Sequence, residues 1–403
     1  MNPEIKQRLD QIRRGEVPEG YKKTKAGIVP NEWNVELLGE YLQEYRQLTN
    51  EIDKYQVYSS SRQGLIPQSQ YYDKRTAVET NLGYKIVPNS FVTYRHMSDD
   101  DVFHFNINKT GSAVLVSSEY PVFTASEKGD LDFIIPILNG TARFRYFCRM
   151  QKMGGTRTRL YYKNLCGYIA AMPPLPEQQK IAEILTMQDK LIELQARKIE
   201  QLQALKKACL QRMFPKKGCD RPEIRFPEFT DAWEQRELGD ICEYHSSSLT
   251  AKDVYEDGSY DLYDANSLIG KTNKGCMEKD YITIIKDGAG VGRTRLLPKN
   301  SMFLGTMGAL TPRNSDLDFL YQLITKADLG KTYTGSTIPH IYFKDYGKNI
   351  YCIPSCIEQQ QIGFYFRNLD NLITLHQRKL DEEKQKKKAL MQLLLTGIVR
   401  VKI

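Results

Sequence analysis

The chain repeats itself on the scale of a domain. Shifting the 403-residue sequence by 181 residues lays residues 175–214 on residues 356–395 without a gap. The Glu-Gln-Gln tripeptide at 177–179 then falls on an identical tripeptide at 358–360. A repeat of this size sets the architecture of the whole chain. Two copies of one structural unit are therefore expected.

Each copy of the repeat carries the pattern of one long helix. Apolar and amide side chains recur at steps of three and four residues, which places them on one helix face. Pro176 suits a helix start, whereas Pro215 cannot continue a helix. The roughly 37 residues between these prolines would span about 55 Å as a helix.

A helix of that length with a single apolar stripe needs a partner helix. The matched length and register predict that the two copies pair with each other, as an antiparallel coiled-coil spacer. The alternative is two ordinary amphipathic helices lying on separate domains. In the second copy, Glu383 and Lys387 fall on the stripe, so looser pairing is expected there.

The segments before the two helices are also duplicated. Trp33 and Gly39 have the same spacing as Trp233 and Gly239, and Asp-Leu-Asp-Phe recurs, each time predicting a helix start. Short β-type runs broken by Gly, Pro, Asn and Ser fill the remainder. The predicted fold class is α+β: two β-rich domains, each followed by a long helix, in an internal pseudo-twofold repeat. The predicted boundaries are 1–28 for an N-terminal helical and linker segment, 29–174 for the first β-rich domain, 175–214 for the first long helix, 215–232 for a linker, 233–355 for the second β-rich domain, and 356–403 for the second long helix with the C-terminal tail.

The loops of the two β-rich domains do not match, which is expected if loops carry recognition and the scaffold carries position. The Arg143–Lys152 stretch is interpreted as one such basic loop, and the glycine-rich Asp287–Arg293 as a tight turn in a binding loop. Arginine offers a bidentate fork to guanine, and amide side chains suit adenine. Any single basic side chain is more often merely solvated, but the set as a whole favours DNA contacts. The candidates are Arg62, Gln63, Gln68, Lys74, Arg75, Arg95, Lys109, Arg157 and Arg159 in the first domain, and Lys271, Lys274, Lys286, Arg293, Arg295, Lys331, Thr337 and His340 in the second.

Composition narrows the function classes. The net charge of +8 favours an acidic partner such as nucleic acid. Eight cysteines without a C-x-x-C pair and five dispersed histidines predict free thiols, no metal site and no catalytic dyad. There is no secretory h-region and no run of 18 apolar residues, so a cytoplasmic location without membrane contact is expected. The chain also lacks a P-loop and an Asn-Pro-Pro-aromatic methyltransferase motif, and we expect no catalysis and no bound cofactor.

The whole chain resembles the specificity subunit of type I restriction–modification enzymes. The resemblance is most specific at Pro176–Ile181, at its counterpart Glu358–Ile362, and at Arg225–Ile241. It implies that each β-rich region is a target recognition domain that reads one half of a bipartite, asymmetric DNA target. The paired helices would set the gap between the half-sites and dock the methyltransferase subunits. The resemblance further implies a bacterial or archaeal source.

The resemblance also implies the partners and their cofactors. Two methyltransferase subunits and two restriction–translocase subunits would join the chain on double-stranded DNA. S-adenosylmethionine, ATP and Mg would be bound by those subunits. Phe364–Phe366 replaces Glu183–Leu185 of the first copy, so the two partner surfaces need not be equal. The residues assigned to the spacer and partner contacts are Glu177, Gln178, Gln179, Ile181, Leu185, Ile192, Ile199 and Leu202 in the first copy, and Glu358, Gln359, Gln360, Ile362, Ile373 and Leu380 in the second.

Two alternatives belong to other classes. One is a coiled-coil adaptor whose two β-rich domains bind proteins and have no DNA role. Affinity for duplex DNA that falls steeply with salt separates the two functions, because phosphate contacts release counterions. The other is a self-sufficient DNA-modifying enzyme, which the missing catalytic motifs argue against.

Overall fold

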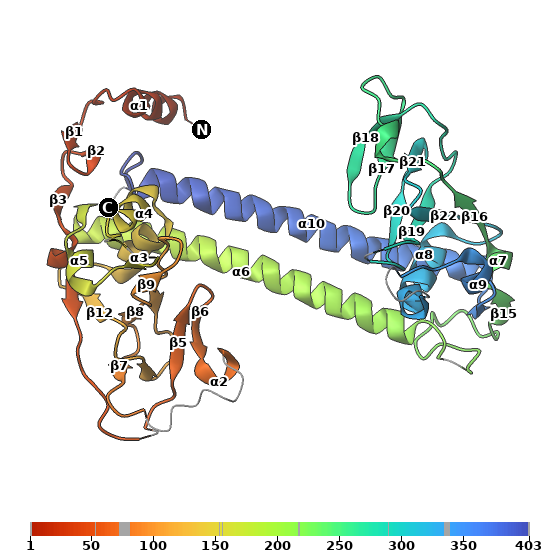
Figure 1. Cartoon of the computed structure of the whole chain (residues 1–403), viewed down its shortest axis with the longest axis horizontal. Helices are drawn as coiled ribbons and strands as arrows, with labels where there is room; N and C mark the ends of the chain where they lie inside the picture. The colour runs from red at the N-terminus through yellow and green to blue at the C-terminus, as the bar shows by residue number, and fades with distance from the viewer. Residues whose placement is uncertain are drawn as a thin grey trace. The chain divides into compact units, whose positions relative to one another are not determined.

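The structure, a computed structural model, describes residues 2–52, 54–71, 81–152, 154, 156–216, 218–288, 290–333 and 339–401 (Figure 1). The chain divides into two compact units. Unit 1 comprises Met1–Leu194 with Leu380–Ile403, and unit 2 comprises Gln195–Lys379. Helices α6 (Leu175–Arg212) and α10 (Cys356–Leu394) each contribute residues to both units. Within the described ranges, no helix is long and apolar enough to cross a membrane.

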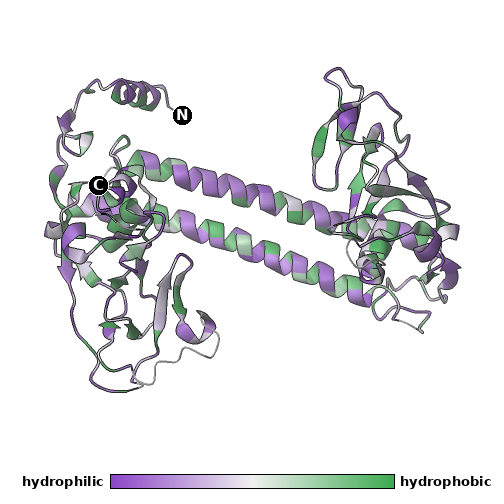
Figure 2. Ribbon diagram, in the orientation of Figure 1, coloured by the Kyte–Doolittle hydropathy of each residue, from purple (hydrophilic) through white to green (hydrophobic). Residues whose placement is uncertain are grey.

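The predicted antiparallel pairing of the two long helices is confirmed. Within unit 2, His376 of α10 hydrogen-bonds Gln195 of α6 at 2.8 Å. Further along α6, Lys206 contacts Asp370, which comes earlier in α10, at 2.6 Å. Residues later in α6 therefore contact residues earlier in α10, as in an antiparallel pair. Figure 2 shows hydrophobic residues recurring among hydrophilic ones along α6, as a one-sided apolar stripe requires, whereas the middle of α10 is mostly hydrophilic.

Within unit 1 the polar residues of the second stripe have partners on α6. Gln188 Nε2 donates to the backbone carbonyl of Glu383 at 3.2 Å, and Lys387 Nζ lies 2.5 Å from Asp189 Oδ1. The 181-residue shift carries Asp189 onto Asp370, and it carries Lys206 of unit 2 onto Lys387. The same interhelical ion pair thus occurs once in each unit, with the two helices exchanging roles.

Unit 1 holds a four-stranded antiparallel sheet in the order β10-β8-β12-β4 and several two-stranded ladders. Strand β3 pairs with β14, the last strand before α6. The bounds are α1 Pro3–Arg13, β1 Tyr21–Thr24, β2 Gly27–Pro30, β3 Asn34–Leu37, η1 Leu38–Tyr41, β4 Leu42–Glu44, β5 Tyr58–Ser61, β6 Gly64–Pro67, α2 Gln68–Tyr71, β7 Lys85–Val87, β8 Val92–Thr93, β9 Met97–Ser98, β10 Asn106–Ile107, β11 Val114–Val116, β12 Val122–Ala125, α3 Leu131–Gly140, α4 Ala142–Arg149, β13 Thr158–Arg159, α5 Tyr162–Cys166 and β14 Ile169–Met172.

Unit 2 repeats this scaffold. Its main sheet has the order β16-β22-β19-β20, and β15 pairs with β23, the last strand before α10. A second sheet, β18-β17-β21, includes one parallel pair. The bounds are β15 Glu234–Glu237, α7 Leu238–Ile241, β16 Cys242–Ser246, η2 Ala251–Asp253, β17 Tyr260–Tyr263, β18 Leu268–Thr272, β19 Tyr281–Ile285, β20 Thr294–Leu297, β21 Ser301–Phe303, β22 Met307–Pro312, α8 Leu317–Ala327, η3 Leu329–Thr332, α9 Phe343–Tyr346 and β23 Ile350–Ile353.

The repeated Asp-Leu-Asp-Phe motif starts a helix in each unit, as predicted. The Asp130 carboxylate accepts the backbone N–H of Phe133 at 3.0 Å at the start of α3. Asp316 does the same for Phe319 at 2.9 Å at the start of α8. A carboxylate in this position satisfies one of the N–H groups that a helix start leaves unpaired. The motif is therefore a helix cap in both copies.

Two local predictions were wrong. The link expected before Trp33 forms the hairpin β1–β2, whose turn ends at Gly27 with a φ of 107°. The basic loop expected over Arg143–Lys152 is mostly helix α4. Phe144 and Cys148, one helical turn apart, are buried, while Arg145 between them and Arg149 after them are exposed. The sequence had this periodicity, but the run of basic residues concealed it.

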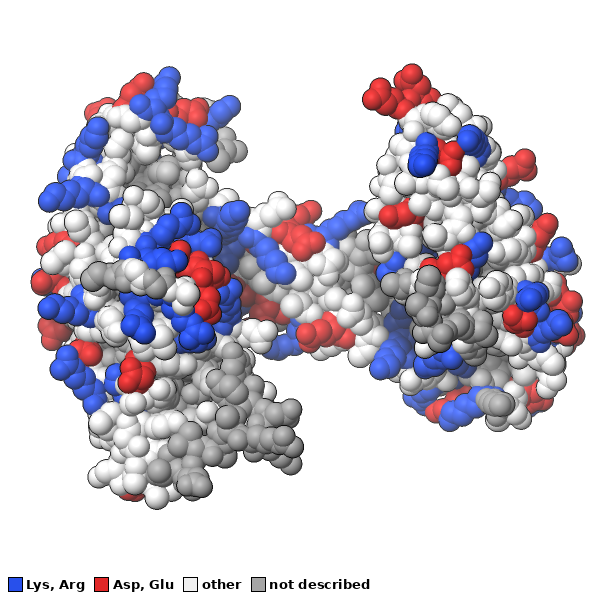
Figure 3. All heavy atoms as spheres, in the orientation of Figure 1, with Lys and Arg blue, Asp and Glu red and all other residues white. Residues whose placement is uncertain are grey.

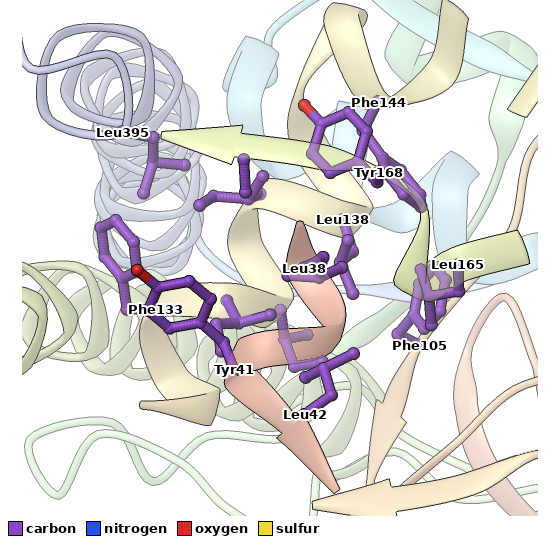
Figure 4. Packing of buried hydrophobic residues seen from close by; sticks show 14 of the residues in the cluster. Leu38, Tyr41, Leu42, Phe105, Phe133, Leu138, Phe144, Leu165, Tyr168 and Leu395 are labelled. Carbon is purple, nitrogen blue, oxygen red and sulfur yellow. The ribbon is translucent and has the colours of Figure 1, made fainter. Parts of the chain in front are cut away.

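Each unit has one main core, and both long helices take part in it. In unit 1, Ile181 and Leu185 of α6 pack in the same cluster as Leu395, which follows α10. Figure 4 shows Leu395 on the side of the cluster that holds Phe133 of α3 and Tyr41 of η1, with Leu165 of α5 on the opposite side. In unit 2, Phe366 of α10 and Phe214, which follows α6, pack together in the corresponding cluster. Each β-rich region is thus bound to both helices by buried apolar surface.

Candidate nucleic-acid interface

A buried glutamate anchors the start of α6 in unit 1. Glu177 has no exposed surface. Its carboxylate accepts the indole N–H of Trp33 at 3.2 Å and two N–H groups of the Arg400 guanidinium, from Nε at 2.6 Å and from Nη2 at 2.8 Å. A buried charge requires such a partner. The tryptophan that opens the repeat and the C-terminal tail therefore meet at one carboxylate.

The start of α10 in unit 2 has the same arrangement with a different arginine. Glu358 is 1% exposed and accepts the Trp233 indole N–H at 3.3 Å. Arg225 forms a bidentate pair with it at 2.7 and 2.8 Å. Arg225 comes from the linker between the two repeats, whereas Arg400 comes from the tail. Neither arginine was assigned a role from the sequence.

The glutamine after each of these glutamates ties the helix to the rest of its unit. Gln178 donates to the carbonyl of Pro173 at 2.9 Å and accepts the N–H of Asp130 at 3.0 Å. Gln359 makes the corresponding contacts at 2.9 and 3.0 Å. These side chains, assigned to spacer and partner contacts, therefore lie inside their units, as do Glu177 and Glu358. Other assigned residues are exposed (Gln179 and Gln360), half-buried (Ile192 and Ile373) or buried (Ile181, Leu185, Ile199, Leu202, Ile362 and Leu380).

Three of the candidate DNA-contact residues in unit 1 line one cavity of about 290 Å³, and two more contact residues that line it. Arg62 and Gln63, at the turn between β5 and β6, line it together with Arg95. Arg159 pairs in β13 with Met97, and Met97 is another lining residue. The fifth, Arg157, reaches the cavity rim through an aspartate. We call this space, together with the residues that line it, the unit 1 cavity.

Three consecutive aspartates at this rim were missed by sequence reasoning. Asp99, which lines the unit 1 cavity, accepts Arg157 Nε at 2.7 Å. Asp100 pairs with Arg62 Nη2 at 2.6 Å, and the bond from that guanidinium lowers the pKa of the Asp100 carboxyl. Asp101 lies 3.8 Å from Arg149 at the end of α4. The acidic run itself was the available sequence signal.

The remaining unit 1 candidates lie elsewhere. Lys109 Nζ is 3.8 Å from the Asp132 carboxylate in the first turn of α3. Gln68 is half-buried at the start of α2. Lys74 and Arg75 fall outside the residues that the structure describes.

The unit 2 candidates are more dispersed. Arg293 Nη2 donates to the Ala265 carbonyl and to Asn266 Oδ1, both at 2.7 Å. The Arg295 guanidinium lies 5.2 Å from the centre of the Tyr263 ring, and its Nη1 is buried without a hydrogen-bond partner among the described residues. Both arginines line a cavity of about 200 Å³.

Other candidate side chains of unit 2 contact neighbouring carboxylates. The pairs are Lys274 with Asp253 at 2.7 Å, Lys331 with Asp328 at 2.9 Å, and His340 Nδ1 with Asp287 at 2.7 Å. Lys271 is exposed on β18, Lys286 follows β19, and Thr337 lies outside the described residues.

The glycine-rich loop has a packing role. A side chain at Gly292 would come within 2.1 Å of the backbone nitrogen of Gly330. This glycine therefore lets the loop pack against η3.

The described surface of each unit carries charged side chains of both signs. Figure 3 shows Lys and Arg interspersed with Asp and Glu on the visible face of each unit. Among the residues with described positions, no group of three or more His, Cys, Asp or Glu side chains is placed to hold a metal ion. All eight cysteines are free thiols. What the geometry presents is arginine and amide groups at the rims of shallow cavities, which is chemistry suited to phosphates and base edges.

Known proteins resemble the chain along nearly its whole length. It is 24% identical to a protein proposed to be the specificity subunit of the type I restriction enzyme MjaX of Methanocaldococcus jannaschii, over 95% of this chain and 97% of that protein. The MjaVIII specificity subunit of the same organism is 25% identical over 57% of this chain and 62% of its own length.

Two solved structures share the fold. The S subunit of a type I restriction–modification system from M. genitalium superposes with a TM-score of 0.57 at 15% identity, covering 92% of this chain and 97% of its own. A chain from a type I R-M system solved to study complex assembly and conformational transition superposes with a TM-score of 0.52 at 16% identity, covering 92% and 99%.

The family model for the type I restriction modification DNA specificity domain matches twice, at residues 45–204 and at residues 230–385. The two matches fall one in each repeat and together span most of the chain. The chain therefore belongs to the family of type I restriction–modification DNA specificity domains, of which it carries two.

Proposed function

We propose that this chain is the DNA-recognition subunit of a type I restriction–modification complex, in which each β-rich region reads one half of a bipartite, asymmetric target. The observation that carries the proposal is the double family match, one DNA specificity domain in each repeat. The differences between the units agree with it. Helix α4 and the segment β5–β11 occur in unit 1, and the sheet β18-β17-β21 occurs in unit 2. Different loops on one scaffold suit two different half-sites.

Methylome sequencing tests this function. A host carrying the chain with its neighbouring methyltransferase gene is compared with a host that carries the methyltransferase alone. We expect a methylated two-part motif that is present only with the chain. An active methyltransferase whose methylation pattern is the same in both hosts would contradict the proposal and favour a protein-binding adaptor.

The proposed partners are two methyltransferase subunits, joined in the restriction complex by two restriction–translocase subunits. We assign S-adenosylmethionine, ATP and Mg to those partners, and catalysis with them, in a bacterial or archaeal cytoplasm. Exposed leucines at matching positions of the two helices support one docking site on each helix. Leu191 and Leu194 of α6 are 43% and 57% exposed, and their counterparts in α10, Leu372 and Leu375, are 43% and 46% exposed. Exposed apolar side chains repeated in register are typical of a contact surface.

The paired helices are proposed to set the gap between the half-sites. We expect that lengthening both helices by one turn, after Leu194 in α6 and after Lys379 in α10, changes the preferred gap. Four residues add about 6 Å of helix, which is one to two base pairs at about 3.4 Å each. The paired contacts on either side of the insertion are kept, because the insertions face each other in the antiparallel pair.

The gap is read from the methylated motif. Insertion into α6 alone serves as the control. It offsets the two helices and is expected to abolish methylation without creating a new motif. An unchanged gap in the double insertion would show that the helices do not measure it.

A further inference from the structure

Three aspartates at the unit 1 cavity place negative charge on a surface that is proposed to bind DNA. A surface that binds DNA gains affinity from positive charge, and carboxylates beside phosphates weaken it by repulsion. Asp99 and Asp100 are nevertheless 68% and 44% exposed at a rim that carries arginines. Each contacts an arginine from a different part of unit 1: Arg157 precedes β13, and Arg62 lies at the β5–β6 turn.

The contacts leave most of each guanidinium available. Arg157 engages its aspartate through Nε, and Arg62 engages its own through Nη2. The two side chains remain 51% and 63% exposed. A guanidinium carries five N–H donors in a rigid plane. A carboxylate on one edge therefore fixes the direction of the plane while the other donors stay free for a ligand.

We propose that Asp99 and Asp100 are positioning residues, which orient Arg157 and Arg62 to read base edges in one half-site. This inference rests on the proposed DNA-recognition function. A free arginine has many rotamers and loses conformational entropy when it binds. An arginine already held by a carboxylate loses less, and only a base edge that matches its fixed plane is contacted well. The aspartates thus lower the affinity for DNA of any sequence and raise the discrimination between sequences.

The neighbouring groups support this assignment. Burial, with a smaller effect of the Arg62 charge, lowers the pKa of His104, which also lines the unit 1 cavity. This shift favours the neutral form of His104. The positive charge at this rim belongs to arginines, two of which the aspartates hold.

The test uses the full chain in complex with its methyltransferase partner. A preferred duplex is first selected from a random-sequence pool. Dissociation constants are then measured for that duplex and for two derivatives, each with one half-site scrambled. The variants are Asp99→Asn and Asp100→Asn, which keep the side-chain size and remove the charge. Asp10→Asn in α1 is the control, since Asp10 also pairs with an arginine, Arg13, but lies far from the unit 1 cavity in sequence.

The two variants are expected to bind the preferred duplex about tenfold more weakly, since a well-oriented base contact contributes discrimination of this order. Their affinity for the duplex scrambled in that half-site should rise about two- to threefold, because a repulsive charge has been removed. Discrimination at the other half-site should not change. A purely structural role would lower affinity for both duplexes, so a loss on the preferred duplex together with a rise on the scrambled duplex identifies positioning.

Two outcomes would overturn the inference. If both variants gain affinity for preferred and scrambled duplexes by the same factor, the aspartates only neutralise charge. If neither affinity moves, the ion pairs have no part in DNA binding. A native complex that selects no duplex from the pool would instead contradict the proposed function, and that result is obtained before any variant is made.

Discussion

Replacing Arg225 with alanine is expected to lower the free energy of unfolding of unit 2 by about 3–5 kcal/mol, because it leaves the Glu358 carboxylate buried and unpaired. Glu358 is 1% exposed, and Arg225 is its bidentate partner at 2.7 and 2.8 Å. The remaining bond, from the Trp233 indole at 3.3 Å, is neutral and cannot balance the charge. The loss is therefore expected to exceed that of an ordinary surface ion pair several-fold.

The measurement can be confined to the unit concerned. The chain has two tryptophans, Trp33 in unit 1 and Trp233 in unit 2. In a Trp33→Phe background, denaturant unfolding followed by tryptophan fluorescence reports on Trp233 alone. The control is Arg236→Ala, which removes a solvent-exposed pair with Glu234 at 2.7 Å and should change the free energy of unfolding little.

A double variant separates lost charge pairing from lost packing. Adding Glu358→Gln to Arg225→Ala removes the stranded charge while keeping an acceptor for the indole, so most of the lost stability should return. If Arg225→Ala is no more damaging than Arg236→Ala, the carboxylate is not held as the structure indicates. If the double variant is no more stable than Arg225→Ala alone, the arginine contributes through packing instead.

The scaffold of this chain could be predicted from its sequence because the same pattern occurs in two copies. A gapless repeat identified α6 and α10, and periodicity in each copy gave the buried stripe that pairs them. The recurring Asp130 and Asp316 gave two helix caps. A pattern that occurs once can arise by chance. The same pattern at the same place in both copies is much stronger evidence for a structural element. The hairpin β1–β2 and helix α4 had no counterpart in the other copy, and both were missed.

The contacts that join distant segments could not be predicted in this way. Arg225 and Arg400 play the same part toward Glu358 and Glu177, but they come from a linker and a tail that do not align in the 181-residue register. Pairing between residues far apart in sequence depends on the folded path of the chain. Recurrence in both copies indicates that a residue is important, but it does not indicate whether the residue is buried. The two glutamates were therefore assigned to spacer and partner contacts.

The candidate DNA contacts show a similar division. Basic residues in the loops that differ between the copies were identified by type, and the structure gathers Arg62, Gln63 and Arg95 at one cavity. The aspartates that hold the arginines were not identified, because a negative charge has no obvious place in a surface for DNA. Side-chain type indicates which groups suit a ligand, but only the fold indicates which groups hold them in place.

Replacing Leu372 and Leu375 together with aspartate is expected to remove one of two methyltransferase subunits from the assembled complex. Burying a leucine side chain contributes about 1.5–3 kcal/mol, so losing two should weaken that contact by more than about 100-fold. The same double substitution at Leu191 and Leu194 should remove the other subunit. The side chains are 43–57% exposed in the chain, so its own stability should change little.

The two sites are not expected to be equally strong. Ile357 and Phe364, 65% and 64% exposed, lie on the same face of α10 as its two leucines. Their counterparts in α6 are Pro176 and Glu183. The α10 site therefore offers more apolar surface, and its methyltransferase should stay bound at lower concentration.

Native mass spectrometry of the co-expressed complex at several dilutions measures both effects. Gln203→Asp in α6 and Gln385→Asp in α10 each add one negative charge at an exposed position on another helix face, and together they match the two charges of a leucine-pair substitution. The variant that carries both should retain two methyltransferase subunits. Changing all four leucines should leave the chain without methyltransferase. Two subunits retained after the Leu372 and Leu375 substitutions would place the docking surface elsewhere. Loss of both subunits from either pair of substitutions would mean that the two methyltransferases bind cooperatively rather than at independent copies of one site.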